Sequence, residues 1–156
     1  MPTWIYFRQG NYSRAIADCE SIQRCDKSCF HAAYLLGVIY ALSELKAQAI
    51  VDFTHAIELA PDRPAPRYQR GIIYYELGNL NGAMDDFTQA RLLQERSGEL
   101  FAEPDETELY AEGAVLYYTG QLYSARLKLN SAMLTAKRFN NPDFYERISA
   151  FIDQYC

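Results

Sequence analysis

Small and apolar residues recur along this chain at a constant spacing. Five pairs of identical residues mark the repeat: Gly37 and Gly71, Tyr40 and Tyr74, Ala49 and Ala83, Phe53 and Phe87, and Ala56 and Ala90. A period of about 34 residues is typical of solenoids of paired helices, in which each unit buries its apolar face only by stacking on its neighbours. The pattern therefore predicts an all-α array.

Helical spacing of these residues predicts where the helices lie. Glycine and alanine at facing positions allow two antiparallel helices to approach closely, while Tyr40 and Phe53 fill the space beside them. The predicted helices cover residues 2–9, 11–24, 29–42, 46–60, 64–77, 80–95, 106–119 and 122–138. A proline at 142 beside Asp143 is typical of a helix start, so a last helix is expected to cap the array.

The same spacing divides the chain into repeats within a single domain. Gly113 follows Gly71 at a longer interval than Gly71 follows Gly37, which predicts an acidic insertion between the second and third repeats. Ala15 precedes Ala49 by the interval that separates Ala49 from Ala83, which indicates that the chain begins inside a repeat. The predicted units are a partial repeat at 1–29, full repeats at 30–63, 64–97 and 106–139, the insertion at 98–105 and the capping helix at 140–156.

Residues 30–63 resemble the tetratricopeptide repeat. The residues that carry this resemblance are Ala33, Leu36, Gly37, Tyr40, Ala49, Phe53, Ala56 and Pro61, with Ala33 at the place where the family pattern has tryptophan. The resemblance implies a right-handed solenoid of helix-turn-helix repeats. Residues 57–61 and 70–74 are similar to those of bacterial members, many of which serve as assembly factors, and this implies a bacterial source.

Tyrosines form the most informative departure from a plain repeat. The chain has 13 tyrosines, and tyrosine can lie half buried with its hydroxyl in water. At about 100° per residue, one set of side chains lies beside the face that Gly37 and Tyr40 turn toward the paired helix. In the family that this chain resembles, that flank lines a concave groove for a peptide or helix. The predicted groove residues are Tyr34, Val38, Tyr68, Ile72, Tyr75, Tyr110, Ala114 and Tyr118.

An aromatic and aliphatic groove suits an amphipathic helix or an extended apolar segment of a partner protein. The family's clamp of Lys, Arg and Asn for a terminal carboxylate is not expected, because Tyr, Val, Ile and Ala occupy most of those positions. We therefore predict a non-catalytic adaptor or assembly factor. The alternative for the tyrosines is that they pack adjacent repeats together.

Arginine fills two positions of the second repeat that are usually apolar in the family. Arg67 and Arg70 are expected to contact a partner at the edge of the groove, or else to pair with carboxylates between helices. The candidate carboxylates are Glu76, Glu106 and Glu112.

Three further interpretations stay open. An apolar patch of Trp4, Tyr6 and Phe7 could be buried in a homodimer. Cys25 and Cys29 could form a thiol or zinc switch, although their spacing is not one of the common zinc arrangements. The acidic residues between Glu95 and Glu112 are either solvated or bind a basic segment.

Composition excludes several classes of protein. A net charge of −5 argues against nucleic-acid binding, which needs clustered lysine and arginine. Two histidines and no glycine-rich phosphate loop argue against an enzyme, and no cofactor is expected. The longest mostly apolar run, 32–42, is too short to span a bilayer. Four cysteines fit a reducing compartment, so a cytoplasmic location is predicted.

Overall fold

The computed structural model describes residues 12–97 and 106–155. These residues form the helices α2 (Tyr12–Cys25), α3 (Phe30–Leu42), α4 (Lys46–Leu59), α5 (Ala65–Glu76), α6 (Leu80–Ser97), α7 (Glu106–Tyr118), α8 (Leu122–Arg138) and α9 (Pro142–Tyr155). The predicted bounds agree to within two residues. The predicted helix 2–9 and the predicted insertion 98–105 lie outside the described residues.

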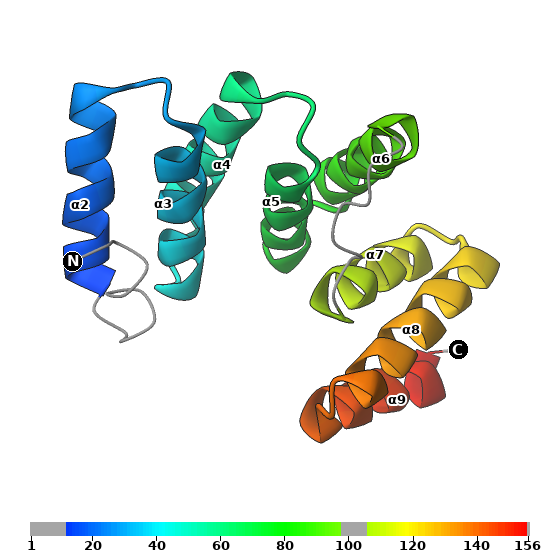
Figure 1. Cartoon of the computed structure of the whole chain (residues 1–156). Coiled ribbons are helices and arrows are strands. Elements are labelled where there is room, and N and C mark those ends of the chain that lie inside the picture. The colour runs from blue at the N-terminus through cyan, green and yellow to red at the C-terminus, as the bar shows by residue number, and fades with distance from the viewer. Residues whose placement is uncertain (1–11, 98–105, 156) are drawn as a thin grey trace.

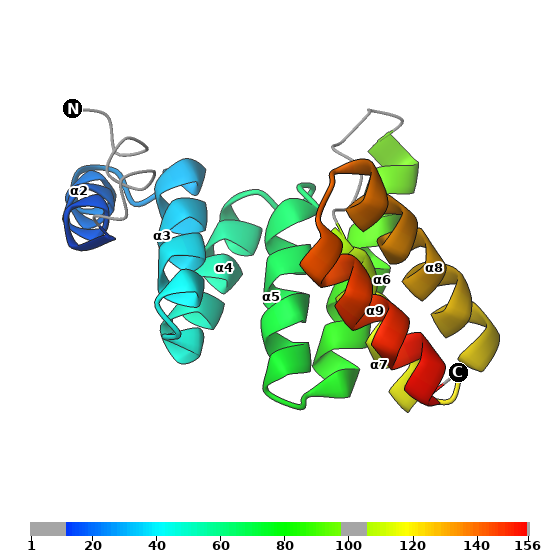
Figure 2. The same cartoon turned by 90° about the horizontal axis from the view of Figure 1, so that it is seen from below.

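The helices stack in pairs along an arch, which confirms the predicted all-α array. Helix α3 packs on α4, α5 on α6 and α7 on α8. Figure 1 shows α3, α5 and α7 along the inner side of the arch and α4, α6 and α8 along its outer side. Helix α9 packs against α8, and Figure 2 shows it in front of α7 when the arch is viewed from below.

Glycine permits the close contact within each pair. A Cβ atom on Gly37 would lie 2.6 Å from Phe53 Cε1, and one on Gly71 would lie 2.8 Å from Phe87 Cε1. Both phenylalanine side chains are fully buried. The phenylalanine ring therefore lies directly against the backbone of the facing helix, and only glycine leaves room for it.

A buried ion pair joins α5 to α6. The Nε and Nη2 atoms of Arg70 donate to the two carboxylate oxygens of Asp86, each at 2.7 Å, and Nη1 donates to Thr54 Oγ1 of α4 at 3.0 Å. The expectation that Arg70 pairs with Glu76, Glu106 or Glu112 is wrong, because Asp86 faces it from the second helix of the same pair. The Nε atom of Arg67 is buried without a hydrogen-bond partner among the described residues.

The third helix pair, α7 and α8, has an equivalent ion pair in which the charges are reversed. Lys128 Nζ of α8 lies 3.1 Å from Glu112 Oε2 of α7, and Glu112 is buried. Glu112 follows Arg70 at the same interval as Lys128 follows Asp86, so the two pairs occupy equivalent positions. Arg91 Nη1 of α6 also lies 3.7 Å from Glu112 Oε1, which links neighbouring pairs.

The first helix pair, α3 and α4, has the acidic residue of this ion pair but no arginine opposite it. Asp52 is the equivalent of Asp86, and Leu36 is the equivalent of Arg70. Burial raises the pKa of the Asp52 carboxyl to about 6, an effect that nearby His55 opposes and Glu20 reinforces. The folded chain therefore binds this proton more tightly than the unfolded chain does.

We expect Asp52→Asn to stabilise the protein at pH 7 by about 1–2 kcal/mol. The wild-type free energy of unfolding should fall as the pH rises from about 4, the usual carboxyl pKa, to about 6. The variant has no carboxyl group at this position, so its free energy of unfolding should not fall over this range. The difference in stability between the variant and wild type should therefore disappear at low pH. Urea unfolding between pH 4 and 8 measures it, with Asp62→Asn on an exposed turn as control. An equal effect of Asp52→Asn at every pH would contradict this explanation.

Candidate functional site

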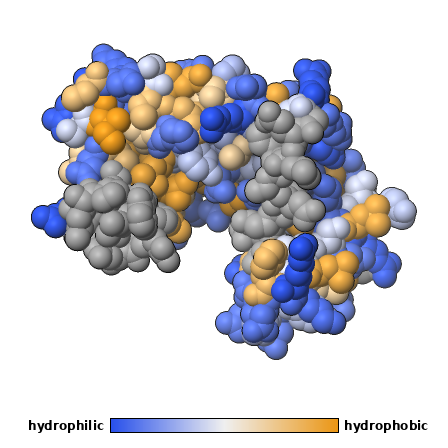
Figure 3. Space-filling view, viewed as in Figure 1, coloured by the Kyte–Doolittle hydropathy of each residue, from blue (hydrophilic) through white to orange (hydrophobic). Residues whose placement is uncertain are grey.

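The inner face of the array is apolar where α3 and α5 form it. Tyr34 and Val38 of α3 and Ile72 and Tyr75 of α5 are all partly exposed. The Tyr34 ring stacks on Phe30 with its centroid 5.9 Å away. Figure 3 shows apolar residues gathered over α3 and the adjoining part of the array. These four predicted groove residues have their inner parts in the core and their outer parts at the surface.

Tyr68 and Ala114 do not reach this surface. Tyr68 is buried in a cluster with Phe87 and the α7 residues Ala111 and Val115, and its hydroxyl donates to Gln94 Oε1 at 3.1 Å. Burial and the neighbouring carboxylate of Glu112 raise its pKa. Ala114 is fully buried in the cluster beneath α9. The prediction that these two residues line an open groove is corrected by the close approach of α7 and α9.

Helix α9 covers the part of the inner face that α7 forms. The Tyr110 ring makes edge contacts with Phe144 and Phe151, with centroid distances of 5.7 Å in both cases. Tyr117 contacts Phe151 at 5.7 Å, and Tyr118 contacts it at 6.3 Å. An aromatic helix of this chain therefore lies against three tyrosines of α7.

A pocket remains open between α5 and α7. Its volume is about 400 Å³, and it is lined by Tyr75, Glu76, Gly78, Leu80 and Tyr118. Burial, followed by the neighbouring Tyr110 and Tyr118, raises the pKa of the Tyr75 hydroxyl. A tyrosine hydroxyl can donate a hydrogen bond. Tyr118 is 51% exposed at the rim. The pocket thus joins two predicted groove residues from different repeats.

Leu42, which follows Val38 by one turn on the flank that the helical spacing identifies, is exposed at the end of α3. Sequence reasoning missed Glu76, which occupies the equivalent position of α5 and lines the pocket. Counting back from Tyr118 by the repeat spacing would have found it. Nothing in the periodicity showed that α9 would lie on α7, because the spacing of Phe144 and Phe151 identifies their helix face but not its neighbour.

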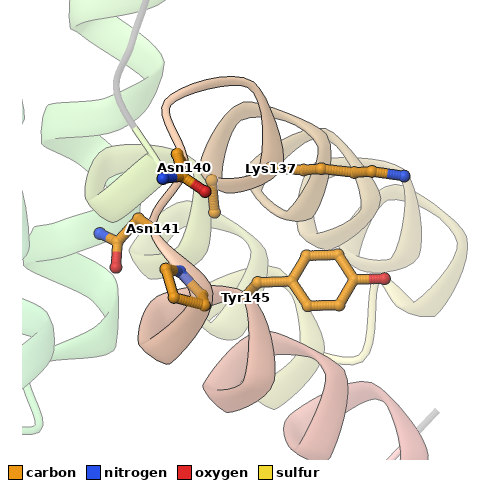
Figure 4. A pocket seen from close by; sticks show the side chains of 6 residues that line it. Lys137, Asn140, Asn141 and Tyr145 are labelled. Carbon is orange, nitrogen blue, oxygen red and sulfur yellow. The ribbon is translucent and has the colours of Figure 1, made fainter.

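A second pocket lies at the turn between α8 and α9 (Figure 4). Its volume is about 310 Å³, and Lys137, Asn140, Asn141 and Tyr145 are among its lining residues. Asn141 Oδ1 accepts a hydrogen bond from Phe144 N at 3.3 Å and so caps the start of α9. Lys137 and Tyr145 extend in the same direction from the two helices. The sequence did not indicate this pocket.

Cysteines offer little for a metal site within the described ranges. Cys19 is buried, Cys25 is exposed and Cys29 is partly buried, and all three are free thiols. Burial and Asp18 raise the pKa of Cys19 to about 11, which makes it a poor nucleophile. Within residues 12–97 and 106–155, no group of three or more His, Cys, Asp or Glu side chains is placed to hold a metal ion.

Two other expectations concern the chain's surroundings. None of the helices that the structure describes is long and apolar enough to cross a membrane. Trp4, Tyr6 and Phe7, which carry the homodimer interpretation, lie outside the described residues. The homodimer and the switch at Cys25 and Cys29 stay predictions.

Comparison with known proteins agrees with the repeat. Residues 30–63 match the family model described as Tetratricopeptide repeat. The human protein "Tetratricopeptide repeat protein 13" is 26% identical, and the match covers 92% of this chain but only 17% of that protein. The chain therefore spans about a sixth of the length of this relative.

Solved structures share the fold at low sequence identity. YrrB, described as a tetratricopeptide repeat protein with an unusual peptide-binding site, is 18% identical with a TM-score of 0.68, covering 94% of this chain and 78% of YrrB. MamA is 14% identical with a TM-score of 0.69, covering 99% and 96% of the two chains. At this identity the likeness establishes a tetratricopeptide repeat array and no particular ligand.

Proposed function

We propose that this chain is a non-catalytic adaptor or assembly factor, because it folds as a tetratricopeptide repeat array and such proteins mediate protein–protein interactions. Its inner face binds an apolar or amphipathic segment of another protein. Tyr34, Val38, Ile72, Tyr75 and Tyr118 supply the contacts, and Leu42 extends them at the end of α3. A cytoplasmic location and a bacterial source stay predictions.

The packing of α9 on α7 carries this proposal. Phe144 and Phe151 of α9 contact Tyr110 edge to face, so this chain already places an aromatic helix on a tyrosine-lined part of the inner face. The part over α3 and α5, which α9 does not cover and where the described tyrosine and aliphatic side chains are partly exposed, has similar chemistry. Partly exposed tyrosines bind a partner at low entropic cost because they have only two side-chain torsions.

YrrB supports the proposal by analogy. Its description names a peptide-binding site, and its fold matches this chain over nearly the whole length. Fold similarity does not carry a ligand from one protein to another, so the chemistry of the inner face in this chain decides the class of partner. That chemistry favours apolar side chains over a terminal carboxylate.

The double variant Leu42→Ser, Tyr118→Ser tests the proposal. Both side chains are more than half exposed, so loss of the ring contact between Tyr118 and Phe151 should lower the melting temperature only slightly, while partner binding should weaken about tenfold or more. Affinity capture from the source cell, quantified by mass spectrometry, compares this variant with wild type and with Val51→Ser on α4. Equal capture by all three proteins would exclude the inner face as the binding surface.

A further inference from the structure

The outer helix α8 exposes a stripe of apolar side chains. Tyr123, Leu127 and Leu134 are 79%, 52% and 67% exposed. At about 100° per residue they fall within roughly 40° of one another around the helix, and they extend over about 16 Å of its length. Figure 1 places α8 on the outer side of the arch. The buried residues of α8, which are Ala125, Leu129, Ala132 and Ala136, lie on the opposite side of the helix, so the stripe points away from the array.

Basic residues border the stripe. Helix α8 has the sequence LYSARLKLNSAMLTAKR, which contains four basic residues and no acidic one, although the chain as a whole has a net charge of −5. Lys128 is engaged with Glu112. Arg126 and Lys137 are exposed beside the apolar stripe, and the guanidinium of Arg138 lies over the Phe139 ring, 5.6 Å from its centroid.

The other outer helices do not share this stripe. The repeat spacing aligns Tyr123, Leu127 and Leu134 with Ala47, Val51 and Glu58 of α4, and with Asn81, Asp85 and Leu92 of α6. Each of those helices has a polar residue at one or more of the three positions. Repeat architecture therefore does not require apolar residues here, and their presence on α8 needs a separate cause.

We propose that the outer face of α8 binds an acidic amphipathic helix of a partner protein. The partner's apolar residues cover Tyr123, Leu127 and Leu134, and its carboxylates lie beside Arg126 and Lys137. Three exposed apolar side chains in register on one helix match the anchors of a helix of about three turns. Complementary charge along one flank of the stripe fixes the orientation and speeds association.

Charge argues against the two other occupants of this face. A second copy of the chain, related by a twofold axis, would bring α8 against α8 and oppose the same cations. An anionic membrane would attract these cations, but it would repel the remainder of a chain with a net charge of −5. An acidic helix satisfies the apolar and the basic residues together.

A pocket lies at the end of the stripe. Lys137 lines the cavity of about 310 Å³ at the turn between α8 and α9, together with Tyr145 of α9 (Figure 4). This position is one turn beyond Leu134. The last turn of the bound helix therefore has a lysine and a tyrosine hydroxyl available as hydrogen-bond donors.

A synthetic helix tests the proposal without knowledge of the partner. The probe is a fluorescein-labelled peptide of about 15 residues, with leucine along one face and glutamate at both flanks. We expect saturable binding to the full chain, weakened about tenfold by Leu127→Ser, Leu134→Ser and by Arg126→Glu, Lys137→Glu. Fluorescence anisotropy measures the affinity, and added salt should weaken it.

Three controls separate this face from other surfaces. Val51→Ser changes the equivalent of Leu127 on α4 and should leave binding unchanged, as should Leu42→Ser, Tyr118→Ser on the inner face. A peptide with lysine in place of glutamate should not bind. Circular dichroism confirms that each variant is folded.

Four results would overturn the proposal. The first is equal binding of the acidic peptide by wild type and by the double variant Leu127→Ser, Leu134→Ser, and the second is equal or tighter binding of the lysine peptide. The third is a dimer in sedimentation that Leu134→Ser abolishes. The fourth is sedimentation with phosphatidylserine vesicles that the same variant abolishes. The dimer would assign the face to a second copy, and the vesicle result would assign it to a membrane.

Discussion

Asp86→Ala is expected to lower the free energy of unfolding by about 3–5 kcal/mol. The carboxylate accepts two hydrogen bonds of 2.7 Å from Arg70, and both side chains are largely removed from water. Removal of the acid leaves the Arg70 guanidinium buried without its charged partner. Among the described residues it keeps the hydrogen bond that Nη1 donates to Thr54 Oγ1. Urea unfolding followed by circular dichroism at pH 7 measures the loss.

The first repeat suggests how to rescue this variant. Leu36 stands there at the position of Arg70, so Arg70→Leu combined with Asp86→Ala should recover most of the lost stability and come within about 1–2 kcal/mol of wild type. Asp85→Ala, at the exposed neighbouring position, serves as the control. A loss below about 1 kcal/mol for Asp86→Ala alone would mean that water reaches the pair and screens it.

The reversal of charge between repeats bears on which helices pair. The repeats have similar small and aromatic positions, so their apolar faces alone discriminate poorly between partners. A mispaired α5 and α8 would oppose Arg70 with Lys128, and a mispaired α7 and α6 would oppose Glu112 with Asp86. Each wrong pairing places like charges at a buried position, and this disfavours it relative to the native arrangement.

Much of the fold could be predicted from the spacing because paired helices need small residues where they cross. Gly37 and Gly71 recur for a physical reason, since a Cβ atom at either position would collide with a phenylalanine ring. The burial of Tyr68 could not be predicted in this way. Periodicity places it on the flank of α5, but only the position of α7 determines that this flank is covered.

Both charged pairs could have been predicted from the sequence. The interval from Arg70 to Asp86 equals the interval from Glu112 to Lys128, and the two pairs have opposite signs. Aligning the repeats at these positions identifies both pairs, whereas the family pattern, which has an apolar residue there, conceals them. The open pocket beside Tyr118 could not be predicted, because it depends on the separation between α5 and α7 and on the position of α9.

The second large effect is expected for Phe53→Ala, which should cost about 3–5 kcal/mol and lower the melting temperature by roughly 10 °C. The ring is fully buried against Gly37, and it shares a core cluster with Ala49 of its own helix and Ile73 of α5. Its loss therefore leaves a cavity within the first helix pair and weakens the contact with the second. Thermal unfolding followed by circular dichroism measures the shift.

Hydrogen exchange can show where this loss falls. Each pair in a repeat array is stabilised mainly by its neighbours, so Phe53→Ala should increase exchange in α3 and α4 most strongly and in α7 and α8 least. Phe139→Ala, which removes an exposed ring after α8, is the matched control and should change neither region by much. Uniformly faster exchange along the whole array would show instead that all repeats unfold as one cooperative unit. In that case the cavity at Phe53 would destabilise the inner face over α5 as much as the inner face over α3.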